Sequence, residues 1–456
     1  MDHAFILFSR IQFAFTIGFH IMFPAINIGM ALFLTVMEAF WLKTRHPAYL
    51  HLCKYWTKIF ALTFGMGVVG GIVMSYELGT NFGHFTDKIG GVLGSLFAYE
   101  VLSAFFLEAG FLGIMLFGWN RVGPKLHFTA TLLVMLGTAL SAFWIMAANS
   151  WMQTPDGFQF VNGRYEVANW WHVILNHSTV HRFLHMMFAS YGSVCFFIAG
   201  ISAYYLWKKE QVELAKRSFS FALWAALFVM PIQIFFGDAV GLIDHQYQPL
   251  KTAAMEGVWH TQSGAPLLLF AWPDQKEAKN YWKVPIPYGA SLLNTHSLHG
   301  TLTGLDTVAP DDRPFVPFVF FSFRIMVGLG LIMFLIALTA LYLRIRKKLY
   351  DERWFQLVCM ITTPIGLAAT IFGWVTAECG RQPWVVYNLI RTSEGASTLL
   401  LSHVITSLVL LIIVYGFIFS FYLIYLVKFI AAGPGTSIEN EHNYLYMSGI
   451  SQEGEK

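Results

Sequence analysis

Charged residues are scarce in this chain. Only 12% of its 456 residues are Asp, Glu, Lys or Arg, whereas 56% are hydrophobic and 17% are aromatic. A soluble domain carries roughly twice that share of charge, so the composition excludes an ordinary soluble protein and predicts an integral membrane protein. The formal net charge of +3 is small and dispersed, which argues against a nucleic-acid partner.

Several familiar motifs are also missing. The four cysteines are scattered and form no CxxC pair, which argues against a disulfide framework and against a zinc or iron–sulfur site. No Walker loop, no GxGxxG motif in strand–helix context and no Ser-His-Asp arrangement is recognisable. The N-terminus lacks the pattern of a cleaved signal peptide. No internal repeat at a fixed period is visible, which disfavours an inverted-repeat transporter.

Long apolar runs fill most of the chain. A membrane-spanning helix needs about 20 apolar residues, and windows of this kind fall at 11–39, 56–76, 92–118, 127–149, 181–207, 218–237, 317–343, 354–377 and 398–427. The sequence therefore predicts an all-α membrane protein with about nine transmembrane helices.

One long segment separates the sixth run from the seventh. We expect transmembrane helices one to six in residues 1–237, a loop at 238–316, helices seven to nine in 317–430 and a tail at 431–456. The loop contains no spanning run, and loops of this length are usually functional. It is either an ordered excursion or a mobile lid.

Lysine and arginine set the expected orientation. Of the 29 such residues, 17 lie in alternate short loops at 40–58, 119–126, 208–217 and 344–353 and in the stretch from Val427 to the C-terminus. Short loops rich in positive charge stay in the cytoplasm. We therefore expect the N-terminus and the long loop outside, and the C-terminus in the cytoplasm.

Ionisable side chains interrupt several of the apolar runs. Such groups at membrane depth are expensive and usually mark an ion, proton or cofactor site. Glu100 and Glu108 are eight residues apart, which would put both on one broad helix face about 12 Å apart along the axis. Two carboxylates on one membrane helix favour a proton relay over isolated polar contacts.

Four further side chains fall at one expected depth, in the outer half of the membrane: His20, His185, Met326 and Glu378. Imidazole and thioether are ligands of low-spin haem iron, and a lone His or carboxylate can hold a five-coordinate iron. The cations that could neutralise haem propionates are Arg182, Arg324 and Arg381. Plainer interpretations stay open: a membrane His is often an interhelical hydrogen-bond partner, and Met326 could be core packing in a chain with 18 methionines.

A set of short segments carries a family resemblance. They are Ser9–Ala14 with Phe19–His20, Glu100 with Phe106–Glu108, Ala148–Gln153, Arg182–His185, Phe323–Gly330 and Gly380–Trp384. In these segments the chain resembles subunit I of cytochrome bd-type quinol oxidases, in order and up to about residue 430. The segment Gln248–Gly257 resembles the family's quinol-binding loop, and the loop length resembles the short-loop form of the cyanide-insensitive subgroup.

The resemblance implies three haems as cofactors. His185 and Met326 would ligate a low-spin haem b. His20 and Glu378 would be the proximal ligands of two high-spin haems, a haem b and either a haem d or a second haem b. Further implied roles are propionate neutralisation by Arg324 and Arg381, a place between haems for Trp374, quinol contact by Lys251 and Glu256, and a catalytic proton route through Glu100 and Glu108.

The activity implied is that of a terminal quinol:oxygen oxidoreductase in the bacterial cytoplasmic (inner) membrane. It would oxidise ubiquinol or menaquinol at the outer face, reduce O2 to water at the high-spin pair, and generate proton motive force without pumping. A second membrane subunit and a small single-span accessory peptide would be its partners. Two other functions stay open at this point: a haem-b electron carrier that does not reduce oxygen, and a haem-free proton or cation transporter.

Overall fold

Nine apolar helical stretches run through the structure. The computed structural model describes residues 3–434, and within that range nine stretches are long and apolar enough to cross a membrane. They are built from α1 (His3–Thr44), α2 (Pro47–Thr80), α3 to α5 (Gly83–Ile89, Ser95–Glu100 and Phe106–Phe117), α6 (Pro124–Gln153), α7 and α8 (Trp170–Ile174 and Thr179–Lys208), α9 (Val212–Tyr247), α12 (Val316–Ile345), α13 and α14 (Arg353–Ile361 and Ile365–Gly380) and α16 (Leu401–Ala432). The predicted all-α membrane class is confirmed.

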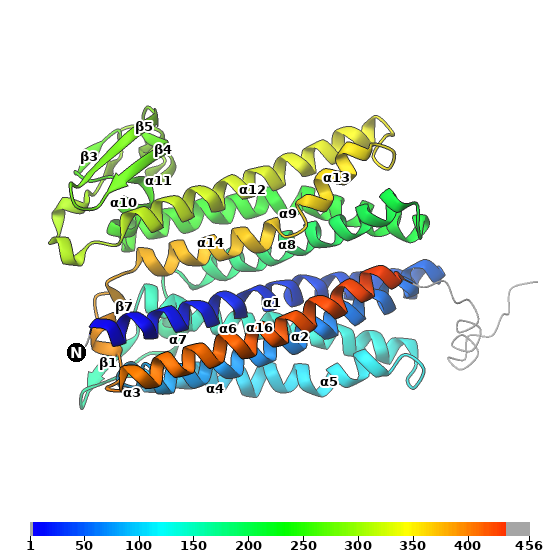
Figure 1. Ribbon diagram of the computed structural model, residues 1–456, viewed down its shortest axis with the longest axis horizontal. Coiled ribbons are helices and arrows are strands. Elements are labelled where there is room, and N and C mark those ends of the chain that lie inside the picture. The colour runs from blue at the N-terminus through cyan, green and yellow to red at the C-terminus, as the bar shows by residue number, and fades with distance from the viewer. Residues whose placement is uncertain (1–2, 435–456) are drawn as a thin grey trace, which may run out of the picture.

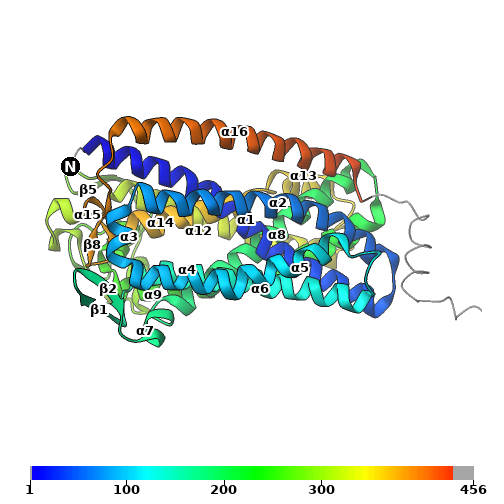
Figure 2. The same cartoon turned by 90° about the horizontal axis from the view of Figure 1, so that it is seen from below.

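The helices form one bundle with two distinct ends (Figure 1). The N-terminus and the folded segment between α9 and α12 lie at one end, called the loop end below, and α16 finishes at the opposite end, called the tail end. Figure 2 shows α16 lying along α1 and α2. The span containing α8 is the most enclosed, with 78% of its apolar window buried, because α8 packs against α1, α6, α9, α13 and α14.

The third span is not a continuous α-helix. Two π-helical turns, Gly90–Gly94 and Val101–Phe105, interrupt it. A π turn accommodates one extra residue, so the residues beyond it are rotated relative to an unbroken α-helix. Eight residues of regular α-helix would place Glu100 and Glu108 about 80° apart around the axis, whereas one intervening π turn reduces this angle to about 20°. The interruption therefore aligns the two carboxylates.

The eighth span, predicted as one run, consists of two helices. The helix α13 ends at Ile361 and α14 begins at Ile365, with a break at residues 362–364. Pro364 lacks a backbone N–H and its ring opposes helical continuation through the preceding turn. The break gives α14 its own course, along which it packs against α12 and α8.

Residues 248–315 form a compact segment at the loop end. The helix α9 continues to Tyr247, beyond the boundary expected at residue 237. The elements that follow are α10 (Pro249–Glu256), β3 (Gln262–Ser263), β4 (Leu267–Asp274), β5 (Lys279–Ile286), α11 (Gly289–Thr295) and β6 (Thr301–Leu302), with antiparallel pairs β4–β5 and β3–β6. Ala253 and Ala254 of α10 share a hydrophobic cluster with Val316 and Val319 of α12. The segment is thus an ordered excursion anchored on the bundle.

Two smaller hairpins complete the loop end. They are β1 (Phe158–Val161) with β2 (Arg164–Val167), and β7 (Trp384–Val386) with β8 (Ile390–Arg391), which α15 (Thr392–Gly395) follows. Asn162 and Gly163 join β1 to β2 with φ angles of 49° and 82°. An Asn-Gly pair favours this two-residue turn, because both positions need positive φ.

A close approach of α1 and α8 yields a testable prediction. A Cβ atom on Gly29 would lie 2.6 Å from Val194 Cγ2 and 2.7 Å from the Ser190 carbonyl oxygen. Gly29→Ala should therefore push the two helices apart and destabilise the protein by about 1–3 kcal/mol, lowering the thermal unfolding temperature of the purified protein. Gly65→Ala on α2 is the matched control, since a Cβ there meets nothing within 4 Å. Equal unfolding temperatures for the two variants would show that this helix contact is not tight.

Candidate functional site

Five charged side chains meet inside the bundle at the loop end. This buried ionic cluster consists of Arg182, Asp244, Lys251, Glu378 and Arg381, contributed by α8, α9, α10 and α14 with the residue that follows it. The side chains of Lys251 and Arg381 are 0% and 5% exposed. Burying charges in a membrane protein costs on the order of several kcal/mol per ion unless each has partners. These five side chains can therefore be buried together only because each has ion-pair or hydrogen-bond partners.

Both carboxylate oxygens of Glu378 are engaged. Oε1 accepts hydrogen bonds from Asn149 Nδ2 at 3.0 Å and from Gln153 Nε2 at 3.2 Å. Oε2 forms an ion pair with the guanidinium of Arg381, three residues further on. Asn149 in turn accepts a hydrogen bond from Arg182 on α8. The helices α6, α8 and α14 are thus joined around one carboxylate, and any metal bound by Glu378 would replace one of these bonds.

The cluster has more cationic groups than carboxylates. Three cations (Arg182, Lys251 and Arg381) face two acidic groups (Asp244 and Glu378) when Lys251 is protonated. Arg381 Nε and Nη1 and Arg182 Nε are buried and have no hydrogen-bond acceptor among residues 3–434. Unpaired buried N–H groups of this kind are costly. A bound anionic group such as a haem propionate would satisfy both the charge and the donors, so these residues fit that cofactor.

Lys251 connects the cluster to the folded segment of the loop end. Its Nζ donates to Gln153 Oε1 at 2.7 Å and lies 3.4 Å from Asp244 Oδ1. Burial lowers the pKa of Lys251 to about 8, and Asp244 opposes that shift. The sequence resemblance assigns Lys251 to quinol contact, yet the structure directs its ammonium group inward.

Glu256 lies at the end of the same helix and pairs with a second predicted residue. Its Oε2 is 2.7 Å from Arg324 Nη2, and its Oε1 accepts from Asn294 Nδ2 at 3.2 Å. Arg324 Nε also donates to the Leu268 carbonyl at 2.7 Å. The structure therefore joins a residue assigned to quinol with one assigned to a haem propionate, and Arg324 lies two positions before Met326.

Three of the four predicted iron ligands face a glycine on a neighbouring helix. A Cβ on Gly70 would lie 2.8 Å from His20 Nδ1, one on Gly237 would lie 3.3 Å from His185 Cε1, and one on Gly373 would lie 2.9 Å from Met326 Sδ. Larger residues at these positions would displace the ligand side chains.

The polar environment of the two predicted histidine ligands is sparse. His20 Nδ1 is buried without a partner among the described residues, and the ring nitrogens of His185 lie 3.3 and 3.4 Å from Gln233 Nε2. Trp374 is half-buried on α14, one turn before Glu378. No group of three His, Cys, Asp or Glu side chains in residues 3–434 could hold a metal ion. A haem iron needs at most two protein ligands, so these single ligands fit that group.

The two carboxylates of the third span both face α6. Ser141 Oγ donates to Glu100 Oε1 at 2.8 Å. Glu108 is buried, and a Cβ on Gly137 would lie 2.7 Å from Glu108 Cγ. The π turn between them accounts for this common direction, and the sequence alone does not reveal it.

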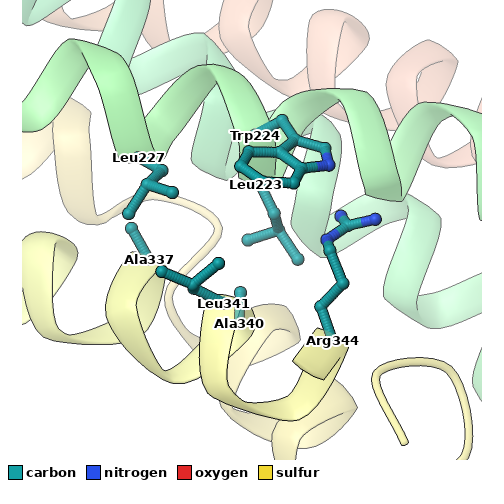
Figure 3. A pocket seen from close by; sticks show the side chains of 7 residues that line it. All are labelled: Leu223, Trp224, Leu227, Ala337, Ala340, Leu341 and Arg344. Carbon is teal, nitrogen blue, oxygen red and sulfur yellow. The ribbon is translucent and has the colours of Figure 1, made fainter. Parts of the chain in front are cut away.

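Several residues of the site were not singled out from sequence. Asn149 and Gln153 belong to a segment that carries the family resemblance, so their polarity at a helix end was an available signal. Asp244 lies in the part of α9 assigned to the loop, and only the length of that helix reveals its position. A small pocket at α9 and α12 (Figure 3) contains none of the predicted site residues, and its lining consists of Leu223, Trp224, Leu227, Ala337, Ala340, Leu341 and Arg344.

The chain is similar to several known proteins over most of its length. The family model for cytochrome bd terminal oxidase subunit I matches residues 8–434. The cytochrome bd ubiquinol oxidase subunit 1 of Bacillus subtilis (strain 168) is 37% identical over 410 residues, covering 86% of each chain. The cytochrome bd-II ubiquinol oxidase subunit 1 of Escherichia coli (strain K12) is 30% identical, covering 89% of this chain and 92% of that protein. The bd oxidase structure from Geobacillus thermodenitrificans superimposes with a TM-score of 0.89 at 29% identity, covering 95% of this chain and 100% of the other.

The fold and the site define a multi-pass membrane oxidoreductase with buried groups suited to haem. The chain belongs to the cytochrome bd terminal oxidase subunit I family. It is therefore a haem-carrying subunit of a terminal quinol oxidase in the bacterial inner membrane, which confirms the predicted class, activity type and location.

The buried ammonium group gives a prediction on pH dependence. Because the pKa of Lys251 in the folded protein is about 8, the unfolded chain binds a proton that the folded chain lacks between about pH 8 and the ordinary lysine pKa near 10.4. Stability contributed by this site should therefore rise with pH across that window, by up to about 1.4 kcal/mol per pH unit. The difference in unfolding temperature between wild type and Lys251→Met should shift in favour of wild type as the pH rises. Lys276→Met, an exposed loop lysine, should follow wild type; a flat difference for Lys251→Met would contradict the prediction.

Proposed function

We propose that this subunit oxidises membrane quinol at the loop end and reduces O2 to water at a high-spin haem pair. The buried ionic cluster carries the proposal, because its unpaired guanidinium N–H groups and excess positive charge suit haem propionates. Bound haems would supply the redox chemistry, and the residues of the chain would hold them and control protons. Two quinols would yield four electrons and four protons on the outer side, and one O2 would take up four electrons and four protons to give two waters.

The ligand assignments follow the sequence prediction. His185 and Met326 would hold a low-spin haem b. Both assignments are supported by the glycine next to the ligand on the neighbouring helix, because a larger residue there would displace the ligand side chain. His20 and Glu378 would hold the high-spin haems, a haem b and a haem d or a second haem b. Ligation by Glu378 would release Arg381 from its ion pair, and Arg381 with Arg182 would then bind propionates. Trp374 would lie between haems.

Quinol binding would use the surface above α10. Glu256 would accept a quinol proton, and its ion pair with Arg324 would transmit a change of charge to the helix that carries Met326. Lys251 would position α10 through Gln153 and Asp244. The quinol would be ubiquinol, the quinol in the names of the Bacillus subtilis and Escherichia coli relatives, or menaquinol.

Protons for water would come from the tail end. The excess of Lys and Arg in the short loops there supports a cytoplasmic location for that end, and Glu108 and Glu100 would pass protons towards the oxygen site. Charge separation would then arise from opposite sides of proton release and uptake, without a pump. A second membrane subunit, as in other bd oxidases, and a small single-span accessory peptide would complete the enzyme.

The test is the optical spectrum of the purified, dithionite-reduced oxidase. We expect low-spin and high-spin haem b bands, with a far-red chlorin band if haem d is present. Met326→Leu should remove the low-spin band or convert it to high spin, because leucine has no sulfur ligand. Met333→Leu is the control: it changes another buried methionine of α12, seven residues after Met326, and should leave the spectrum unchanged. Absence of all haem bands would refute the proposal in favour of a transporter, and low-spin haem alone would favour an electron carrier.

A comparison of electron donors tests the quinol site. Glu256→Ala should reduce quinol-driven oxygen consumption at least tenfold, because it removes the proton acceptor and leaves Arg324 unpaired. Oxygen consumption with an artificial donor that bypasses the loop should change less than twofold. Glu277→Ala, an exposed carboxylate of the same segment, is the control and should affect neither. Equal losses with both donors would place Glu256 outside the quinol site.

A further inference from the structure

A second buried acid–base pair lies in the bundle away from the ionic cluster. Glu38 on α1 and His127 on α6 are 1% and 0% exposed in their side chains, and Nδ1 of His127 lies 2.7 Å from Oε1 of Glu38. Thr131 Oγ1 donates to the other carboxylate oxygen at 2.7 Å. His127 lies in the first turn of α6, so the pair is close to the tail end, on the opposite side of Glu108 from the ionic cluster.

The hydrogen bonds fix how many protons this pair holds. His127 Nε2 lies 3.2 Å from the Met115 carbonyl, and a carbonyl can only accept, so Nε2 carries a hydrogen. One further proton then occupies the hydrogen bond between Nδ1 and Oε1, either on the imidazole or on the carboxyl group. In both forms the pair has no net charge, which suits a buried site.

A line of side chains leads from this pair towards Glu108. His127, Thr131, Val134, Thr138 and Ser141 recur at steps of three and four residues, so they share one face of α6. Ser141 at the far end bonds Glu100, and Glu108 packs against Gly137 between them. The axial distance from His127 to Ser141 is about 21 Å. Val134, which is fully buried, is the one apolar member of the line.

Aromatic and apolar groups surround the pair. Trp119 in the turn between α5 and α6 covers the imidazole, with ring centroids 3.8 Å apart. On the α2 side the buried Cys53 thiol is within electrostatic range of Glu38. Figure 2 shows α5 and α6 side by side, with their connecting turn at the tail end. The imidazole therefore lies directly against the turn that joins α5 and α6 at the tail end.

We propose that Glu38 and His127 form the proton-holding entry of the route to Glu108 and Glu100. When the pair passes its proton along α6, it is left with one net negative charge, and a proton from water at the tail end restores neutrality. The inference rests on the proposed function, since it names the group through which protons for oxygen reduction enter. Glu38 and His127 act through Glu108 and touch neither oxygen nor haem.

The test measures proton uptake by the intact oxidase. The fully reduced enzyme is mixed with O2, and a pH-sensitive dye reports protons taken from the bulk. Glu38→Gln keeps the shape and a hydrogen-bond acceptor but cannot carry the proton, so it should slow uptake at least tenfold while the haem spectrum stays unchanged. Glu38→Asp should recover part of the rate. Glu210→Gln, an exposed carboxylate at the same end, should match wild type.

The outcomes separate the two proposals. Wild-type uptake in a spectrally intact Glu38→Gln enzyme would leave the pair a structural link between α1 and α6 and overturn the inference alone. No proton uptake by wild type would overturn the proposed function as well. Should Glu38→Gln fail to assemble, Thr131→Val removes one hydrogen bond to Glu38 without changing charge. It should slow uptake and shift a carboxyl stretching band in the redox-induced infrared difference spectrum, and an unshifted spectrum with normal uptake would refute the proposal.

Discussion

The burial of Glu378 among cations is the constraint on which the loop end depends. A carboxylate inside a membrane bundle is tolerated only when its surroundings supply opposite charge and hydrogen-bond donors. Here Arg381 supplies the charge and Asn149 and Gln153 supply the donors, so α6 and α14 are held in register at this depth. The cluster nevertheless contains one more cation than it has acids, and the unpaired N–H groups of its two arginines remain. A bound anionic group would satisfy both the charge and the unpaired donors.

The same cluster explains why the segment after α9 is ordered. Lys251 reaches from α10 to Gln153, and Glu256, at the other end of this eight-residue helix, reaches to Arg324 on α12. A short helix is only marginally stable in isolation, so these two buried contacts, together with the alanines packed on α12, hold it in place. The Glu256 contact ends on α12, which carries the predicted ligand Met326, and the Lys251 contact ends on Gln153, which donates a hydrogen bond to the predicted ligand Glu378.

Much of this architecture is accessible from the sequence, because the membrane imposes simple rules. Length and polarity predict nine spans, and the rarity of ionisable groups within apolar runs makes Glu378 and His185 stand out from the residues around them. The partners of those groups are not accessible in the same way. The Glu256–Arg324 pair joins residues 68 positions apart, and no local pattern specifies which buried cation meets which carboxylate. The roles assigned to single haem ligands stay predictions, since the contacts describe space and charge but no bound iron.

The third span shows most clearly where sequence reasoning ends. A spacing of eight residues predicts two carboxylates on a broad helix face. The π turn between them reduces the angle between the two side chains around the helix axis, so that both contact α6. The turn is set by backbone hydrogen bonding, which leaves no signature in polarity or periodicity. Its effect is specific: without it, Glu100 and Glu108 would diverge, and the polar line on α6 that starts at His127 would meet only one of them. The π turn therefore brings two buried acids to the same side of the span, next to α6, and this alignment is the structural consequence of an irregular backbone at the centre of a largely exposed apolar helix.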